Sequence, residues 1–380
     1  MRRWSRLRVE SLDVAAQASP RHRAAAVVVG LVLACVFLVT QAGLNPEELF
    51  STVSESTFGS GLGMTQMLEI ATGLILAACA FAVGYRGRLW NVGIEGQLFM
   101  GAWAATGVAF SLPNVPTALV VPLMLLAAMV AGMAWILLPA VLRAYLGVSE
   151  IITTLMLNFV ATLWLSYWDN GPWRAATAPG GLTSDPLPER TWFPELTLGT
   201  VTIGLGLFIA VVVTVALWLF FRSTRYGFRS TLVGASPKTA SYAGVDLRRQ
   251  TISLMLLSGA VAGLAGAVIE LDVVHRYSTA LSDNTGFTGV IAAVIAAGSF
   301  PGLLVTGALM GFVAAAGNGL KIVGVAGNVV LLLVGLLLFC AALADVLARY
   351  RIRLGRPATA DERDSGPSVS AMEVTPAERP

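Results

Sequence analysis

Charged residues are scarce in this chain. Aspartate, glutamate, lysine and arginine make up 12% of its 380 residues, whereas about 25% is usual in soluble domains. Hydrophobic residues make up 56%, and the mean hydropathy is +0.74. A soluble core does not require this much apolar surface, but a lipid bilayer does. The composition therefore predicts an integral membrane protein whose main partner is lipid, with no nucleic acid partner.

Cysteine and histidine are also scarce. Cys35, Cys79 and Cys340 lie in apolar runs without a CxxC pair, so we interpret them as small buried hydrophobes. His22 and His275 are too far from any partner for a metal site or a catalytic triad. The phosphate-binding pattern G-x-x-x-x-G-K-[ST] is missing as well. We therefore expect no cofactor, no enzymatic activity and no ATPase within this chain.

Long apolar runs follow one another from residue 24 to residue 346, and each predicts a membrane-spanning helix. Residues 284–320 are 37 residues without a charge; as one helix they would measure about 55 Å, too long for a single crossing of about 30 Å. Gly298–Gly302 divides this run into 286–299 and 302–317. The other spans are predicted at 24–42, 62–83, 89–110, 117–142, 148–168, 199–221, 251–271 and 325–346. The fold class is an all-α bundle of about ten spans, or of eight spans plus a re-entrant pair.

Basic residues are distributed unequally between the two sides of such a bundle. With ten crossings and the N-terminus inside, 21 of the 25 Lys and Arg residues fall in segments on the cytoplasmic side. This asymmetry is the positive-inside pattern, and it predicts that both termini are cytoplasmic. The predicted organisation is a basic N-terminal segment at 1–23, a membrane domain at 24–346 with an external loop at 169–198 and a cytoplasmic loop at 222–250, and a disordered tail at 347–380.

The third predicted span begins with an unusually polar stretch, LWNVGIEGQLFMG at 89–101. A carboxylate such as Glu95 at this depth costs roughly 2.5–3.5 kcal/mol on insertion scales, so it usually faces a partner or a water-filled cavity. A local interpretation stays open, with Asn91 as an N-cap and Glu95 snorkelling to the interface. The stretch NVGIEGQ resembles the NIG-EGQ signature of permease subunits of ABC importers for ribose, nucleosides and branched-chain amino acids.

The fifth predicted span carries a second polar pattern. Thr154, Asn158 and Thr162 are spaced by four residues and therefore share one helix face. Such a stripe either binds helices together or lines a path through the membrane. The stretch GVSEIITTLMLN, from Gly147 to Asn158, resembles the GV-E-I-TLMLN block of the same permeases.

The cytoplasmic loop contains a compact helix signal. Ser236 suits the N-cap, Pro237 the first helical position and Gly244 the position after the helix. A helix of about two turns is not stable alone, so it must dock either on its own bundle or on a partner. Residues 224–245 resemble the loop by which these permeases engage their ATPase, although Ser236 and Ser241 stand where Asn and Ala are usual. Ala240 and Ala243 are expected on the contact side.

The resemblance extends over residues 43–346, with a further similar block at GFTGVIAAVIAAGSFPG from 286 to 302. It implies a permease subunit of an ABC importer in a bacterial plasma membrane. It also implies separate ATPase subunits, an external substrate-binding protein and a second, similar permease subunit that forms a heterodimer. The implied translocation residues are Asn91, Gly93, Glu95, Gly96, Gln97, Thr154 and Asn158. The implied ATPase-coupling residues are Gly234, Pro237, Ala240, Ala243 and Gly244.

The sequence indicates the chemical class of the transported substrate but does not identify the substrate itself. GLNPEELF at 43–50, together with the EGQ and TLMLN blocks, looks most like nucleoside or simple-sugar permeases, and branched-chain amino acids are the alternative. From the residues alone, an ion-coupled secondary transporter that uses Glu69, Glu95 and Glu150 also stays open. A membrane-embedded enzyme is a third class, but the sequence offers no catalytic constellation for it.

Overall fold

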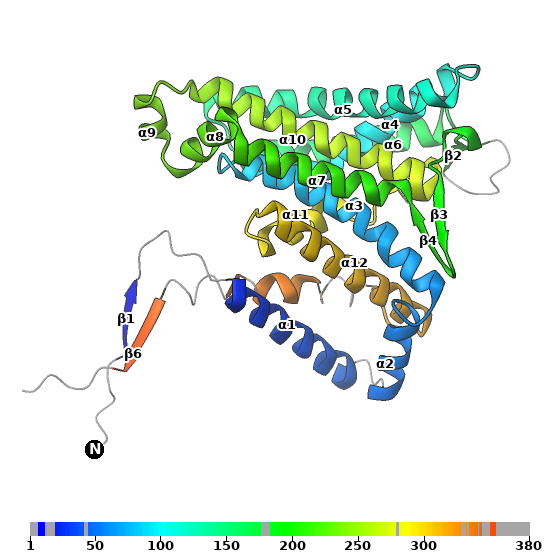
Figure 1. Cartoon of the computed structure of the whole chain (residues 1–380), viewed down its shortest axis with the longest axis horizontal. Helices are drawn as coiled ribbons and strands as arrows, with labels where there is room; N and C mark the ends of the chain where they lie inside the picture. Colours follow the sequence, from blue (N-terminus) through cyan, green and yellow to red (C-terminus); the bar gives the residue numbers. More distant parts are fainter. Residues whose placement is uncertain are drawn as a thin grey trace, which may run out of the picture. The chain divides into compact units, whose positions relative to one another are not determined.

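The computed structural model describes residues 7–11, 20–41, 45–175, 183–278, 281–327, 332, 334–340, 342–343 and 350–354. Most of them are helical (Figure 1). The helices are α1 (Pro20–Gln41), α2 (Pro46–Glu55), α3 (Gly61–Tyr85), α4 (Ile94–Ser111), α5 (Thr117–Val141), α6 (Glu150–Asn170), α7 (Leu205–Ser223), α8 (Arg225–Ala235), α9 (Pro237–Tyr242), α10 (Leu247–Ile269), α11 (Thr285–Ile295) and α12 (Phe300–Ile322). The strands are β1 (Leu7–Ser11), β2 (Thr183–Pro186), β3 (Glu195–Leu198), β4 (Val201–Gly204), β5 (Arg276–Ser278) and β6 (Tyr350–Leu354).

The chain divides into two compact units, and the smaller one contains both chain ends, Met1–Val29 and Cys340–Pro380. Within it, β1 and β6 form an antiparallel pair in which Leu7 lies opposite Leu354. Tyr350–Leu354 is the described part of the tail at 347–380, and the disorder expected there stays a prediction. Residues 355–380 of that prediction lie outside the described residues.

The larger unit, Gly30–Phe339, is a helical bundle built around α3 and α10. Small residues on α10 allow its neighbours α4 and α5 to pack closely against it. Gly259 of α10 approaches Gly132 of α5 so closely that a Cβ on either would collide with the other's backbone, and Gly263 does the same at Ala128. Gly266 meets the backbone of α4 at Leu98 in the same way. Three glycines on one helix thus replace side-chain packing with backbone contact, the usual device of membrane helix pairs.

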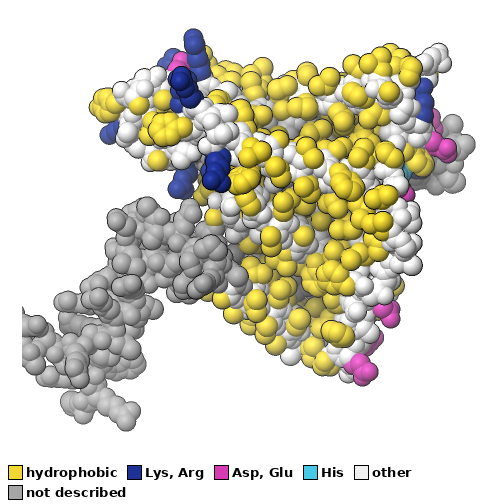
Figure 2. Space-filling model, in the orientation of Figure 1, with side chains coloured by type: hydrophobic (Ala, Val, Ile, Leu, Met, Phe, Trp, Pro, Cys, Tyr) yellow, Lys and Arg dark blue, Asp and Glu magenta, His cyan; other side chains and the backbone are white. Residues whose placement is uncertain are grey.

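The outer helices α5, α6 and α7 expose mostly apolar side chains, among them Leu126, Phe159 and Val212. Figure 2 shows hydrophobic side chains over much of the visible face of this unit. Six helices in the described part of the chain are long and apolar enough to cross a membrane, and two shorter apolar helices lie at Ala25–Thr40 and Thr285–Ile295. The predicted polytopic helical bundle is therefore confirmed, while the number of crossings stays a prediction.

The long uncharged run is broken as predicted, but at different positions. α11 ends at Ile295, and Ala297 and Gly298 have φ values of 55° and 67°, which turns the chain sharply into α12. α12 then continues to Ile322, five residues beyond the predicted end at 317. Both helices pack on α3, with Gly289 of α11 at Ala77 and Gly307 of α12 at Ile75. α11 has only 11 residues, about 16 Å, so its length matches only half of a bilayer core of about 30 Å.

Two other expectations need correction. The sixth span was expected from residue 199, but β3 and β4 form a hairpin with Gly199 at φ 66° in its turn, and the helix begins at Leu205. The third span begins at Ile94 rather than 89, because residues 89–93 are not helical.

The polar stretch at 44–63 contains α2, whose Leu49 packs with Leu38 and Leu320. Residues 327, 332, 334–340 and 342–343 of the expected last span are helical, and its other residues after 327 lie outside the description.

The two ends of the larger unit differ in the charge of their side chains. α8 and α9 lie at one end of the bundle, and the β3–β4 hairpin lies at the other (Figure 1). On the visible face, most of the Lys and Arg side chains gather at the α8–α9 end, whereas most of the Asp and Glu side chains lie toward the other end (Figure 2). This distribution agrees with the cytoplasmic position predicted for residues 222–250.

Candidate functional site

The polar stretch that leads into α4 forms a buried junction with α3, α6, α10 and α11. Asn91 and Gln97 exchange two hydrogen bonds: the Nδ2 of Asn91 donates to Oε1 of Gln97 at 2.9 Å, and the Nε2 of Gln97 donates to Oδ1 of Asn91 at 2.9 Å. Asn91 also donates to the Ser258 hydroxyl of α10 at 2.8 Å, and Ser258 donates to the Ala80 carbonyl of α3 at 2.6 Å. The N-cap interpretation of Asn91 is wrong, since Gly93 occupies that position and Asn91 is fully buried.

α6 closes over this stretch through Asn158. Its Oδ1 accepts from the Gly96 N–H at 2.9 Å, and its Nδ2 donates to the Val92 carbonyl at 3.0 Å. A Cβ on Gly93 would lie 2.8 Å from the Cβ of Thr154, and a Cβ on Gly96 would lie 2.9 Å from Oδ1 of Asn158. Both glycines are therefore needed for the close approach of α4 and α6. The polar stripe predicted on α6 binds helices together at this level.

Glu95 joins the junction to α11. Its Oε2 accepts a hydrogen bond from the backbone N–H of Gly286 at 2.7 Å, and the side chain is buried. The N-cap residue of α11, Asn284, is left-handed at φ 60° and makes no capping hydrogen bond with its side chain in the described structure. The first N–H groups of a helix need an acceptor, and the helix dipole favours a negative charge there. Glu95 thus caps α11 from another helix and does not snorkel to the interface.

Glu150 lies at the start of α6 and also has polar partners within the structure. Its Oε2 lies 3.2 Å from Nε of Arg143, and its Oε1 accepts from the backbone N–H of Trp90 at 3.3 Å. Two of the three carboxylates named for an ion-coupled transporter, Glu95 and Glu150, therefore have fixed structural partners. This arrangement weakens that alternative, because a coupling carboxylate must be free to exchange an ion.

The structure thus brings all seven predicted translocation residues together. They lie within one junction of α4, α6, α10 and α11, and the described structure places none of them on the wall of the cavity considered next. Their position indicates that they fix helices relative to one another, and direct contact with a transported molecule stays a prediction. The sequence pattern did not reveal Ser258 and Gly286, which complete the junction.

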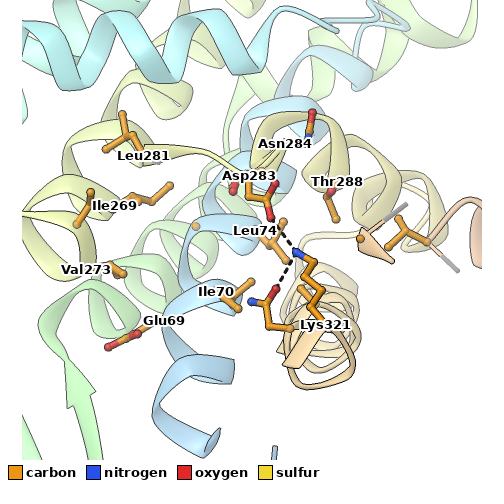
Figure 3. A pocket seen from close by; sticks show the side chains of 17 residues that line it. Glu69, Ile70, Leu74, Ile269, Val273, Leu281, Asp283, Asn284, Thr288 and Lys321 are labelled. Atoms are coloured by element: carbon orange, nitrogen blue, oxygen red, sulfur yellow. Dashed lines mark hydrogen bonds and ion pairs between the residues drawn. The ribbon is translucent and has the colours of Figure 1, made fainter. Parts of the chain in front are cut away.

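A cavity of about 420 Å³ adjoins the junction (Figure 3). Residues of α3, α11 and α12 line it, together with the end of α10, the segment between α10 and α11 and residues after α12. Lys321 extends from α12, with its Nζ 3.7 Å from Oδ2 of Asp283 and 3.1 Å from Oδ1 of Asn318. The apolar lining includes Ile70, Leu74, Ile269, Val273 and Leu281, and the polar lining is Glu69, Asp283, Asn284, Thr285, Thr288, Asn318 and Lys321.

Sequence reasoning did not identify this cavity. Its polar residues come from α3, from the start of α11 and from the end of α12, so no single local pattern unites them. Two signals were nevertheless present: the run Ser-Asp-Asn-Thr at 282–285, just before α11, and the Asn318–Lys321 spacing of three, which places both side chains on one helix face. The first turn of α11 belongs to both features, because Glu95 caps it while Asn284, Thr285 and Thr288 face the cavity.

The cytoplasmic loop folds largely as its capping signals predict. α9 spans Pro237–Tyr242, Ser236 accepts a hydrogen bond from the Thr239 N–H at 3.3 Å, and Gly244 ends the turn at φ 77°. One expectation needs correction: Ala240 is fully buried in its own chain, whereas Ala243 is exposed. A partner would therefore meet Ala243 and the neighbouring Tyr242, which is 92% exposed.

The loop is fixed to the membrane helices through α8. Gln250 of α10 donates to the Ser230 hydroxyl at 2.7 Å. Gly234 packs directly on the backbone carbonyl of Arg86, which follows α3 and leads into the junction. The Arg86 guanidinium lies 5.8 Å from the ring centroid of Phe221 and 5.1 Å from that of Phe300. A continuous set of contacts thus connects the loop, the junction and α11.

Comparisons with known proteins agree with this architecture. Residues 63–342 match the family described as "Branched-chain amino acid transport system / permease component". The chain is 29% identical to the nucleoside ABC transporter permease protein NupB of Lactococcus lactis, over 85% of this chain and 90% of that protein.

Two other relatives cover most of the chain. The glucose ABC transporter permease protein TsgB13 of Haloferax volcanii is 31% identical over 84% of this chain and 87% of its own length. The guanosine ABC transporter permease protein NupP of Bacillus subtilis is 28% identical over 75% of this chain and 82% of its own length. With the family matched over residues 63–342 of a polytopic helical bundle, the chain belongs to the permease components of ABC transporters, integral membrane subunits that rely on a separate ATPase.

Proposed function

We propose that this chain is the permease subunit of an ATP-driven importer that carries nucleosides or simple sugars across a bacterial plasma membrane. The observation that carries the proposal is the combination of relatives named for nucleosides, guanosine and glucose, each covering at least three quarters of this chain. Branched-chain amino acids are the alternative, in keeping with the description of the family.

The proposed topology has ten crossings with both termini in the cytoplasm. α11 and the segment before it form one of these crossings as a half-helix, and the residues after 325 form the last. The supporting observation is the 21 to 4 division of basic residues, together with the position of α8 and α9 at the basic end of the bundle. The β2–β5 and β3–β4 pairs then lie outside, where a substrate-binding protein delivers its cargo.

The proposed partners follow from this orientation. An ATPase engages the α8–α9 loop on the cytoplasmic side, through the exposed Tyr242 and Ala243. A second permease subunit of similar sequence completes the transporter as a heterodimer. The apolar outward faces of α5, α6 and α7 provide ample membrane-buried surface for such a contact.

Uptake in a strain that lacks the gene for this chain tests the proposal. We expect the deletion to abolish ATP-dependent uptake of radiolabelled adenosine, guanosine, uridine or glucose, and a plasmid copy to restore it. The same cells should take up labelled leucine, isoleucine and valine normally. Loss of branched-chain amino acid uptake alone would establish the alternative, and nucleoside or sugar uptake that persists after ATP depletion would exclude an ATP-driven importer.

A further inference from the structure

We propose that the cavity between α3, α11 and α12 is a nucleoside-binding site on the translocation path. This inference rests on the proposed import function and goes further by choosing nucleosides over simple sugars. Its starting point is the uneven lining of the cavity. Ile269, Val273 and Leu281 lie on one side together with the single polar residue Glu69, whereas Asp283, Asn284, Thr288 and Lys321 lie on the other (Figure 3). At about 420 Å³ the cavity falls within the range usual for small-molecule sites.

The polar side suits the hydroxyl groups of a ribose. Lys321 and Asn318 offer donors, Asp283 offers carboxylate acceptors, and the hydroxyl of Thr288 offers both. The pair between Lys321 and Asp283 is long, at 3.7 Å, and these side chains are 40% and 84% exposed. Such a pair contributes little by itself, so ligand hydroxyls can replace part of it at small cost.

The apolar side suits a nucleobase. Ile70 and Leu74 lie one turn apart on α3, and Ile269 and Leu281 also line the cavity. Burial of an aromatic ring against these side chains is favourable, because apolar surface leaves water. A simple sugar carries hydroxyl groups all around its ring, and hydroxyls placed against this wall would lose hydrogen bonds to water without replacement. The lining therefore favours an amphipathic ligand with one flat apolar part.

The charge of the lining also distinguishes between nucleosides and nucleotides. The ammonium of Lys321 is already paired with Asp283, and Lys321 is the only Lys or Arg among the described residues that line the cavity. A nucleotide phosphate would therefore find no unpaired cation there to compensate its charge. The ligand class is therefore a neutral nucleoside rather than a nucleotide. The first turn of α11 connects this site to the buried junction, since Asn284 and Thr288 line the cavity while Gly286 is held by Glu95.

Photolabelling of the purified, fully assembled transporter tests the inference. The probe is 8-azidoadenosine at a fixed concentration, with competition by adenosine, ribose, glucose and AMP. We expect covalent label in peptides that contain residues 69–74, 281–288 or 314–321. Adenosine should abolish the labelling, whereas ribose, glucose and AMP should compete at least tenfold more weakly. Label confined to other parts of this chain, or equal competition by glucose, would overturn the inference.

Variants then locate the contact. Asn318→Leu and Thr288→Val each remove one hydrogen-bonding group, and each should lower labelling about three- to tenfold. The matched control is Asn170→Leu at the exposed end of α6, which should label as the unmodified chain does. Co-purification of the ATPase verifies that each variant is assembled. Unchanged labelling in both cavity variants would refute the site even where adenosine uptake continues, whereas a transporter that imports neither nucleosides nor simple sugars would refute the proposed function itself.

Discussion

Glu95 of α4 caps the start of α11 by accepting a hydrogen bond from the backbone N–H of Gly286, 191 residues further along the chain. A carboxylate inside a membrane protein is costly unless a partner compensates for it. Here the partner is a helix end whose first N–H groups need an acceptor, so each feature resolves the difficulty of the other. The position of the half-helix α11, and with it one wall of the cavity, therefore depends on Glu95.

Replacing Glu95 tests this dependence. We expect Glu95→Leu to abolish uptake while the subunit still inserts, because a buried N–H without an acceptor costs about 1–3 kcal/mol. Glu95→Gln should retain part of the activity, since its amide oxygen can still accept the hydrogen bond. Uptake normalised to the amount of subunit in the membrane is the measurement, and Glu189→Leu, at an exposed position of the loop at 169–198, is the control. Full activity of Glu95→Leu would show that the cap is dispensable.

The second prediction concerns the close contact of α4 and α6. Alanine favours a helix over glycine by about 0.8–1.0 kcal/mol, yet Gly96→Ala should destabilise the protein, because the new methyl would lie 2.9 Å from the Oδ1 of Asn158. Gly107→Ala, in the same helix, meets nothing nearer than 3.8 Å in the described structure and should be neutral or stabilising. The midpoint of thermal unfolding in detergent distinguishes the two, and equal midpoints would contradict the predicted contact.

How far the sequence predicts this structure depends on how far apart in the sequence the interacting residues lie. α9 was predictable because Ser236, Pro237 and Gly244 act within the loop itself. The β3–β4 hairpin was missed because Val201 and Ile203 continue the apolar run of α7, so hydropathy alone cannot separate strand from helix. The partners of the junction were missed for a different reason. Ser258 lies 167 residues from Asn91, and no local pattern relates such distant positions.

The third prediction concerns membrane sidedness. In a variant that lacks the three native cysteines, Glu189→Cys on the exposed 3₁₀ turn should react with an impermeant maleimide added to intact cells. Lys238→Cys in α9 should react only after the membrane is disrupted, because the α8–α9 end is predicted to be cytoplasmic. The reverse pattern of labelling would invert the topology, and equal labelling at both positions in intact cells would indicate that the cells were leaking.

The fourth prediction separates a contact with the ATPase from packing within the loop. Ala243→Trp adds a ring to the exposed surface of the loop, so we expect it to lower ATPase co-purification and uptake together while the subunit stays folded. Ala240→Trp places the same ring where no space exists, since Ala240 is fully buried, and should also lower the thermal stability of the loop. If Ala243→Trp leaves ATPase recruitment and uptake unchanged, the loop packs only on its own bundle.

Gly244→Val tests the geometry of the same loop without adding a bulky group to its surface. Gly244 has φ 77°, a conformation that costs a side-chain-bearing residue about 1 kcal/mol or more, so valine should unwind the end of α9. The matched control is Gly199→Val in the β3–β4 turn, where φ is 66° and the described structure places no atom within 4 Å of a new Cβ, as at Gly244. Both variants carry the same backbone strain, but only Gly244→Val lies in the loop predicted to engage the ATPase. Selective loss of ATPase co-purification in Gly244→Val would therefore identify α9 as the coupling element, whereas equal loss in both variants would trace the effect to general misfolding.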